Sequence, residues 1–308
     1  MSIGKRIGYV CLSFLPFVGM ILLQNGIMFG CITGLVLSML QQGKGGNLFS
    51  MAASAILTEH YMELMILIQI LTLLVFGLWY YLTCVHGSEG GKNRTCMTVR
   101  KAAAIPAASL GLYLLISVYM VIMQWAAPTL TAQYEKLIDV RGIADLTILS
   151  TLASLLLAPL GEEIIFRGLT FQYLRKAGAG FWFANILQAA LFGAAHLNWI
   201  QSSYTFVMGM ILGCILRRFR TLAAPILFHM FFNFWGTYLA SAISGIPAYR
   251  WFPLAEAGIG ILALVFAGRL LKGGVSEPLA VPVLSPLDTL VEQHGDDAED
   301  QYGSDDQI

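Results

Sequence analysis

Three groups of polar residues stand within the apolar second half of the chain, and their residue types suit acid–base chemistry. In chain order, the groups are Glu162 and Glu163 with Arg167, Phe192 with His196, and His229 with Asn233. An ionisable group at membrane depth costs at least about 2.5–3.5 kcal/mol on insertion scales, so it usually has a function. Acids, a base and two histidines grouped in this way predict a buried catalytic site.

The two acids of the first group are expected to have different roles. On a helix, Glu163 and Arg167 are four residues apart and can pair on one face. Glu162 points about 100° away from that face, because each helical residue turns the chain by that angle. We therefore expect Glu163 to be held in an ion pair and Glu162 to face a cavity as a general base for water. The alternative is a structural pair that only fixes helix packing.

The other two groups place a histidine one helical turn from its companion residue. Phe192 can pack beside His196 and fix its rotamer, although a histidine near the end of a span is also a common packing residue. His229 and Asn233 share a helix face, and both can donate hydrogen bonds to an oxyanion. The alternative for this pair is an interhelical polar contact, which is worth about 0.6 kcal/mol in membrane bundles.

Long apolar segments must position these groups. The chain has 308 residues, of which 57% are hydrophobic and 12% charged, about half the charge of a soluble domain. We predict an all-α fold, a polytopic membrane helix bundle with about eight transmembrane helices. The expected spans are about 7–40, 61–84, 103–125, 146–174, 181–197, 202–216, 222–243 and 253–271.

The first apolar run is too long for one straight span, and a break near Gln24 would reverse the sidedness of every later span. Charge decides between the two interpretations. With an unsplit first span and a cytoplasmic N-terminus, thirteen Lys and Arg residues lie on the inner side and four on the outer side. This distribution follows the positive-inside rule. We therefore predict an integral, multi-pass protein with both termini in the cytoplasm, located in the cell membrane if the source is bacterial.

Three regions follow from this pattern. Residues 1–145 contain three spans and loops, residues 146–272 contain the polar groups, and residues 273–308 form an acidic tail. The tail holds nine of the eighteen acids and no Lys or Arg, so it is expected to be disordered. The five cysteines show neither metal-ligand spacing nor a disulfide framework.

Proline and glycine mark two further features. Pro159 and Gly161 precede Glu162 and are expected to kink or loosen that helix, leaving backbone groups in need of partners. Gly209 and Gly213 are four residues apart in the sixth span, which favours close packing against another helix.

The motifs GEEIIFRG (161–168), FGAAH (192–196) and HMFFN (229–233) together resemble the CPBP family. That family includes type II CAAX prenyl endopeptidases and Abi-type or bacteriocin-processing membrane proteins. The resemblance covers about residues 146–244. It implies an intramembrane endopeptidase in which Glu162 activates water, His196 assists, and His229 and Asn233 stabilise the oxyanion. Glu163, Arg167 and Phe192 would support the site.

Several points stay open within this resemblance. We favour a metal-free mechanism without a cofactor, since no HExxH motif is present. The alternative is a zinc ion bound by Glu162, His196 and His229.

The expected partners are the lipid bilayer and a peptide or protein substrate that can carry a lipid, with no nucleic acid. A silent scaffold or bacteriocin-immunity protein, or a proton-coupled transporter, is the alternative function.

Helix depth presents a difficulty for the predicted site. Glu162 lies about 16 residues into its span, roughly 24 Å of helix, whereas His196 falls near the outer end of its own span. His229 falls on the inner half of the bundle. Straight, perpendicular helices would keep these residues apart, so we expect a kink, a tilt or a deeper start of the fifth helix.

Overall fold

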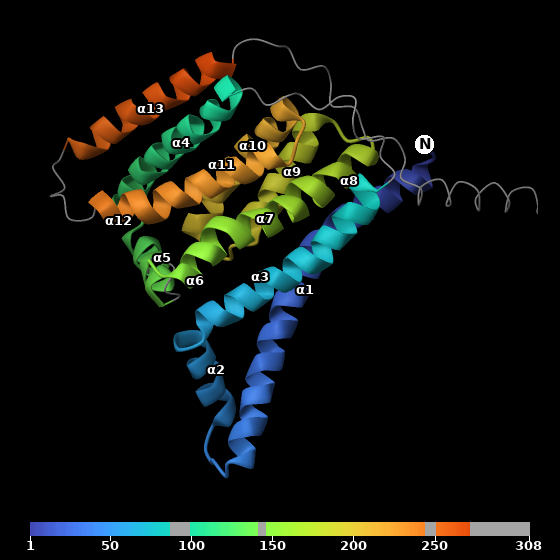
Figure 1. Cartoon of the computed structure of the whole chain (residues 1–308), viewed down its shortest axis with the longest axis vertical. Coiled ribbons are helices and arrows are strands. Elements are labelled where there is room, and N and C mark those ends of the chain that lie inside the picture. The colour runs from blue at the N-terminus through green and yellow to red at the C-terminus, as the bar shows by residue number, and fades with distance from the viewer. Residues whose placement is uncertain (87–98, 141–145, 244–250, 272–308) are drawn as a thin grey trace, which may run out of the picture.

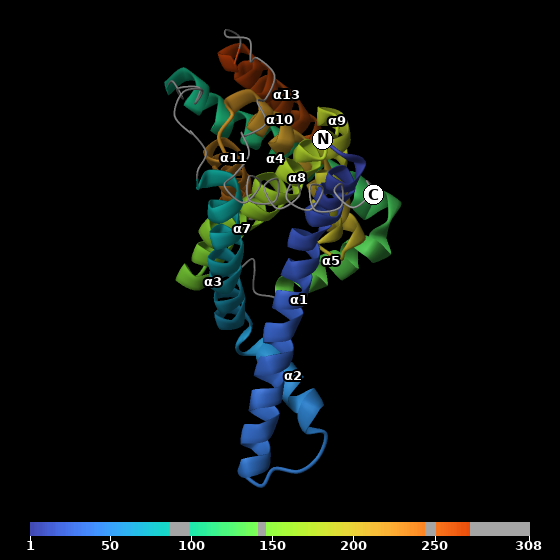
Figure 2. The ribbon, with the colours of Figure 1, turned by 90° about the vertical axis from the view of Figure 1, so that its right-hand side faces the viewer.

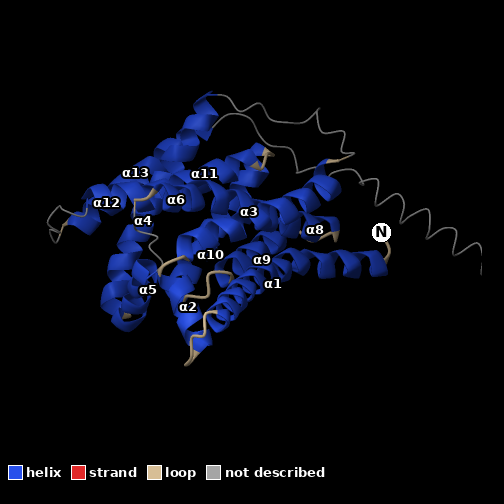
Figure 3. Cartoon of the chain, turned by 60° about the horizontal axis from the view of Figure 1, so that its bottom comes forward, coloured by secondary structure: helices blue, strands red, loops and turns tan. Residues whose placement is uncertain are grey.

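The described part of the chain is built from helices. In this computed structural model the described residues are 1–86, 99–140, 146–243 and 251–271, and they contain no β-strand (Figure 3). The predicted all-α class is confirmed. The acidic tail at 273–308 lies outside the described residues.

The helices follow one another with short connections. The N-terminal region contains α1 (Ile3–Gln41), α2 (Leu48–Thr58), α3 (Tyr61–Tyr80) with the π-helical η1 (Tyr81–Val85), α4 (Val99–Ala126) and α5 (Pro128–Val140). A continuous rod then comprises α6 (Ile148–Thr151), η2 (Leu152–Leu157), α7 (Ala158–Glu163), η3 (Ile164–Thr170) and α8 (Phe171–Lys176). The last elements are α9 (Phe181–Ala194), α10 (Trp199–Phe219), α11 (Ala223–Phe234), η4 (Trp235–Leu239), α12 (Ala240–Ile243) and α13 (Phe252–Leu271).

Six helices in the described residues are long and apolar enough to cross a bilayer, compared with the eight spans expected. They are Ile3–Gln41, Tyr61–Val85, Val99–Ala126, Ile148–Lys176, Trp199–Phe219 and Phe252–Leu271. The other two expected spans are helical but do not qualify. The fifth is only the 14-residue α9. The seventh runs through α11, η4 and α12 and includes the polar residues His229 and Asn233, which lower its hydropathy. The long first run is one helix, as expected.

The first helix reaches well beyond the bundle. Its 39 residues correspond to about 58 Å at 1.5 Å per residue. In Figures 1 and 2 its second half and α2 extend together away from the other helices. A small apolar cluster formed by Ile32, Ala52, Ile56, Leu64 and Ile68 joins α1, α2 and the start of α3. Two short helices, α2 and α5, lie between the expected spans of this N-terminal region.

The main core surrounds the rod that carries the two acids. Phe166, Phe192, Phe228 and Leu212 are almost fully buried in one cluster formed by η3, α9, α11 and α10. On the far side, α4 packs closely on α13 and also contacts α11 (Figure 1). The α11 helix is thus enclosed between the acid-bearing rod and the α4–α13 pair.

Glycines allow α9 and α10 to pack closely, as expected for Gly209 and Gly213. A Cβ atom on Gly209 would lie 3.0 Å from the Cβ of Ala189. One on Gly213 would overlap the side-chain oxygen of Asn185 and lie 2.7 Å from its Cγ. The Asn185 amide instead donates a 3.0 Å hydrogen bond to the Met210 carbonyl, so the glycine leaves room for a buried polar contact.

We expect Gly213→Ala to lower the thermal unfolding midpoint of the purified protein, because overpacking a close contact costs about 1–3 kcal/mol. Gly258→Ala is the matched control, since a Cβ at this glycine of α13 meets nothing within 4 Å. It should leave the midpoint unchanged or raise it slightly, because alanine favours a helix. Equal midpoints for the two variants would contradict the close approach of α9 and α10.

Candidate active site

The expected ion pair within the first motif is present and fully enclosed. Arg167 Nη1 donates to Glu163 Oε1 at 2.8 Å, and both side chains have 0% exposure. Arg167 Nη2 also donates to the Gly209 carbonyl at 3.3 Å. The guanidinium lies over the Phe192 ring, with its central carbon 4.5 Å from the ring centroid. The pair therefore ties the acid-bearing rod to α9 and α10.

Glu163 has a second partner that spacing alone did not indicate. The same Oε1 atom lies 2.9 Å from His229 Nδ1 on α11, sixty-six residues later in the chain. Because a carboxylate can only accept hydrogen bonds, Nδ1 carries the proton in this contact. The carboxylate thus fixes the ring orientation of His229 and turns its other nitrogen, Nε2, toward the cavity.

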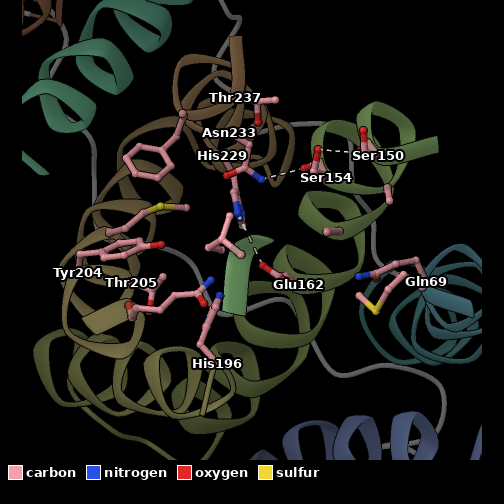
Figure 4. Close-up of a pocket in the computed structure, with 18 of the residues that line it drawn as sticks. Gln69, Ser150, Ser154, Glu162, His196, Tyr204, Thr205, His229, Asn233 and Thr237 are labelled. Carbon is pink, nitrogen blue, oxygen red and sulfur yellow. Dashed lines mark hydrogen bonds and ion pairs between the residues drawn. The ribbon is translucent and has the colours of Figure 1, made fainter. Parts of the chain in front are cut away.

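Glu162 occupies the position expected of the second acid. Its Oε2 atom lies 3.6 Å from His229 Nε2, and its side chain is 24% exposed while that of Glu163 is enclosed. Figure 4 shows the two side chains facing each other at the cavity wall. The two adjacent acids therefore occupy different environments, one sealed in an ion pair and one open to the cavity.

Asn233 is held by a backbone group that Pro159 sets free. In the π-helical turn η2, the Ala158 N–H bonds to the Ala153 carbonyl five residues earlier. The same register would pair the Ser154 carbonyl with residue 159, which is a proline without an N–H. Asn233 Nδ2 donates to that carbonyl at 2.8 Å (Figure 4). The loosening expected at Pro159 therefore positions the amide of Asn233.

His196 lines the same cavity as Glu162 and His229. The α9 helix ends at Ala194, so His196 lies in the turn beyond it rather than in a span. Its Nδ1 atom is 2.9 Å from the Phe192 carbonyl, and the two rings meet edge to face at 5.2 Å. The Phe192 ring also contacts His229 at 5.9 Å. Phe192 therefore packs between the two histidines.

The short fifth helix removes the difficulty of depth. Fourteen residues span about 21 Å, which is less than the thickness of a bilayer core. The turn that follows α9 brings His196 to the cavity that Glu162 and His229 share. The expected 181–197 span is wrong in length for this reason.

The cavity has a volume of about 620 Å³ and opens between several helices. The motif residues that line it are Glu162, Phe192, His196, His229 and Asn233. The sequence did not indicate Gln69, Tyr204 or Thr205, which also line it (Figure 4). Gln69 and Thr205 are polar residues buried in apolar helices, and this property is the signal that would have identified them.

A buried amide network behind the site was also missed. Gln188 Nε2 donates to the Gly209 carbonyl at 3.0 Å and to Asn185 Oδ1 at 2.8 Å. The Gly209 carbonyl is the one that Arg167 also contacts. Asn185 and Gln188 are fully buried, and their three-residue spacing within an apolar helix was the available signal. This network supports the guanidinium from the α9–α10 side.

The residues expected to bind zinc in the alternative mechanism are not arranged as a three-ligand site. A catalytic zinc site uses three protein ligands, and among the described residues no three His, Cys, Asp or Glu side chains gather as a metal-binding group. Glu162 contacts His229, and the other nitrogen of His229 is bound by Glu163. The residues as arranged do not fit a catalytic zinc ion, and zinc stays a prediction from the resemblance.

We expect Glu163→Ala to destabilise the protein strongly, because it leaves Arg167 as an uncompensated buried charge at a cost of about 3–5 kcal/mol. Glu162→Ala is the matched control one residue earlier, at a side chain that reaches the cavity. It should shift the thermal unfolding midpoint in detergent far less. A larger loss of stability in Glu162→Ala would contradict the division of the two acids.

Comparison with known protein families gives a match to the second half of the chain. Residues 144–235 match the family described as type II CAAX prenyl endopeptidase, Rce1-like. No match was found among curated proteins or among solved structures. The matched range includes all three motifs, from Glu162 to Asn233, and the six long apolar helices agree with an integral membrane protein. Residues 144–235 are therefore similar to the type II CAAX prenyl endopeptidases, and this match supports the family that the three motifs predicted.

Proposed function

We propose that the protein hydrolyses a peptide bond of a small protein or peptide within the membrane, using water activated by Glu162. The observation that carries this proposal is the unequal environment of the two adjacent acids. Glu163 is enclosed with Arg167, whereas Glu162 lines the cavity and faces His229 Nε2 at 3.6 Å. A carboxylate open to water beside an oriented imidazole suits general-base catalysis.

The proposed reaction balances without a cofactor. Glu162 takes a proton from water while the water oxygen bonds to the carbonyl carbon of the substrate. The resulting oxyanion accepts hydrogen bonds from the Asn233 amide and from His229 Nε2–H when the imidazole carries both protons. The C–N bond then breaks, and Glu162 returns its proton to the leaving nitrogen.

The remaining motif residues position these groups. Glu163 holds the Nδ1 side of His229, and the Ser154 carbonyl holds the Asn233 amide. His196 would orient the water or act as a second base from the same cavity wall. The substrate would be a CAAX-type terminus, a leader peptide or a bacteriocin-related peptide, since each presents a short cleavable segment.

We expect Glu162→Gln to abolish cleavage of a quenched fluorescent peptide library by the purified protein, because an amide cannot act as the base. Thermal unfolding should be nearly unchanged. Glu63→Gln, at an exposed acid near the start of α3, should retain full activity. Cleavage that survives Glu162→Gln would overturn the mechanism, and loss of wild-type cleavage on chelation would support the zinc alternative instead.

We expect Asn233→Ala to lower kcat by about 10²–10³-fold with a small change in KM, as for removal of one oxyanion donor. Steady-state kinetics on a peptide selected from the library measures both constants. Asn25→Ala is the control, because this exposed asparagine donates to the Ile21 carbonyl within its own helix, α1. An effect on KM alone would assign Asn233 to substrate binding rather than to the transition state.

A further inference from the structure

One end of the helix bundle carries most of the basic residues, and several of them make contacts between helix ends there. Arg100 at the start of α4 donates to the Arg269 carbonyl near the end of α13 at 3.0 Å. Arg218 at the end of α10 donates to the Leu271 carbonyl at 2.8 Å. The Lys176 ammonium lies 3.4 Å from the Thr83 carbonyl. These helix ends therefore form a single basic face of the bundle.

Several residues that line the cavity lie at the helix ends opposite the basic face. Tyr61 is the first residue of α3, and Gln201 is the third residue of α10. Ser150 lies in α6 at the start of the acid-bearing rod, and Ser241 lies in α12 at the far end from Ala223. Each of these four lining residues lies at the end of its helical segment that is away from the basic face. The mouth of the cavity thus lies away from the basic face.

The walls of the cavity restrict the chemistry of what can enter. Its described lining contains one carboxylate, Glu162, and two histidines, His196 and His229, but no Lys, Arg or Asp. The rest is apolar, aromatic, hydroxyl or amide, and three flexible methionines, Met62, Met65 and Met208, are included. An anionic side chain would lose hydration here without gaining a Lys or Arg partner, and a cationic one would pair with Glu162, the proposed base. Methionine, in contrast, adapts to varied apolar shapes.

Because the positive-inside rule places a basic face in the cytoplasm, we propose that the cavity receives an uncharged peptide segment from the non-cytoplasmic side of the membrane. This inference rests on the proposed function for the identity of the occupant. Ser150 precedes Glu162 by twelve residues, or about 18 Å of helix. An extended chain advances about 3.3 Å per residue, so about five or six residues would reach from the mouth to the acid.

Two cysteine variants on one helical rod test from which side of the membrane the cavity is reached. Ala223→Cys and Ser241→Cys lie at opposite ends of Ala223–Ile243, and both native residues are exposed. Eighteen residues separate them, about 27 Å of helix. The five native cysteines are first replaced by alanine, and this background is checked for peptide cleavage. Spheroplasts that express each variant are then treated with a membrane-impermeant maleimide.

We expect Ser241→Cys to be labelled in intact spheroplasts and Ala223→Cys only after permeabilisation. A bulky adduct on Ser241→Cys should also lower peptide cleavage about tenfold or more by filling the mouth, while the adduct on Ala223→Cys should not. Gln201→Cys, at a second lining position, replaces Ser241→Cys if that variant does not fold. The reverse labelling pattern, with Ala223→Cys reached from outside, would overturn the proposal.

The chemical class of the occupant is tested with matched peptides in detergent, where sidedness plays no part. Placing Lys or Asp beside the scissile bond of a neutral substrate should lower kcat/KM by about tenfold or more. Equal rates for neutral and charged peptides would overturn the uncharged-segment assignment. The assays also separate the two proposals: labelling reports the side of access even if no peptide is cleaved, and cleavage in detergent supports the peptidase even if the labelling is reversed.

Discussion

The structure depends on one buried carboxylate oxygen. Glu163 Oε1 accepts hydrogen bonds from both Arg167 and His229, and it thereby joins the acid-bearing rod to α11. A buried charge without a partner costs several kcal/mol, so loss of either contact should lower the free energy of unfolding. Arg167 extends the connection to α10 through the Gly209 carbonyl and to α9 through the Phe192 ring. Four helical segments are thus registered against each other by one anion, and the cavity forms where they meet.

This constraint explains how two neighbouring acids can differ in role. Consecutive residues on a helix face directions about 100° apart, so a bundle can enclose one and expose the other. Glu163 is the enclosed acid because Arg167 lies one turn later on its face. Glu162 then faces the ring that Glu163 has already oriented. The difference between the two acids therefore comes from packing, since their side chains are chemically identical.

The sequence predicted the parts of the site that depend on helical spacing. It indicated the Glu163–Arg167 pair and the open position of Glu162, and both are present. It did not predict that His229 binds Glu163, because sixty-six residues separate them and only the tertiary fold brings them together. The Asn233 contact was also missed, since it requires knowing that the helix before Pro159 adopts the π register. Apolar runs predicted the helices well, but hydropathy alone could not show that α9 ends after fourteen residues.

Two of the three motifs lie on helices that are poorly suited to crossing a membrane alone, whereas Glu162 lies in the long apolar rod Ile148–Lys176. His196 follows the short α9, and His229 and Asn233 lie in the interrupted rod of α11, η4 and α12, neither of which is among the six long apolar helices. Polar side chains lower the apolar character of a segment, and a free carbonyl at membrane depth requires protein around it. The long helices α3, α4, α10 and α13 supply that enclosure, because they pack around these segments or around their neighbours. The membrane therefore constrains the outer helices, whereas the buried ion pair constrains the inner ones.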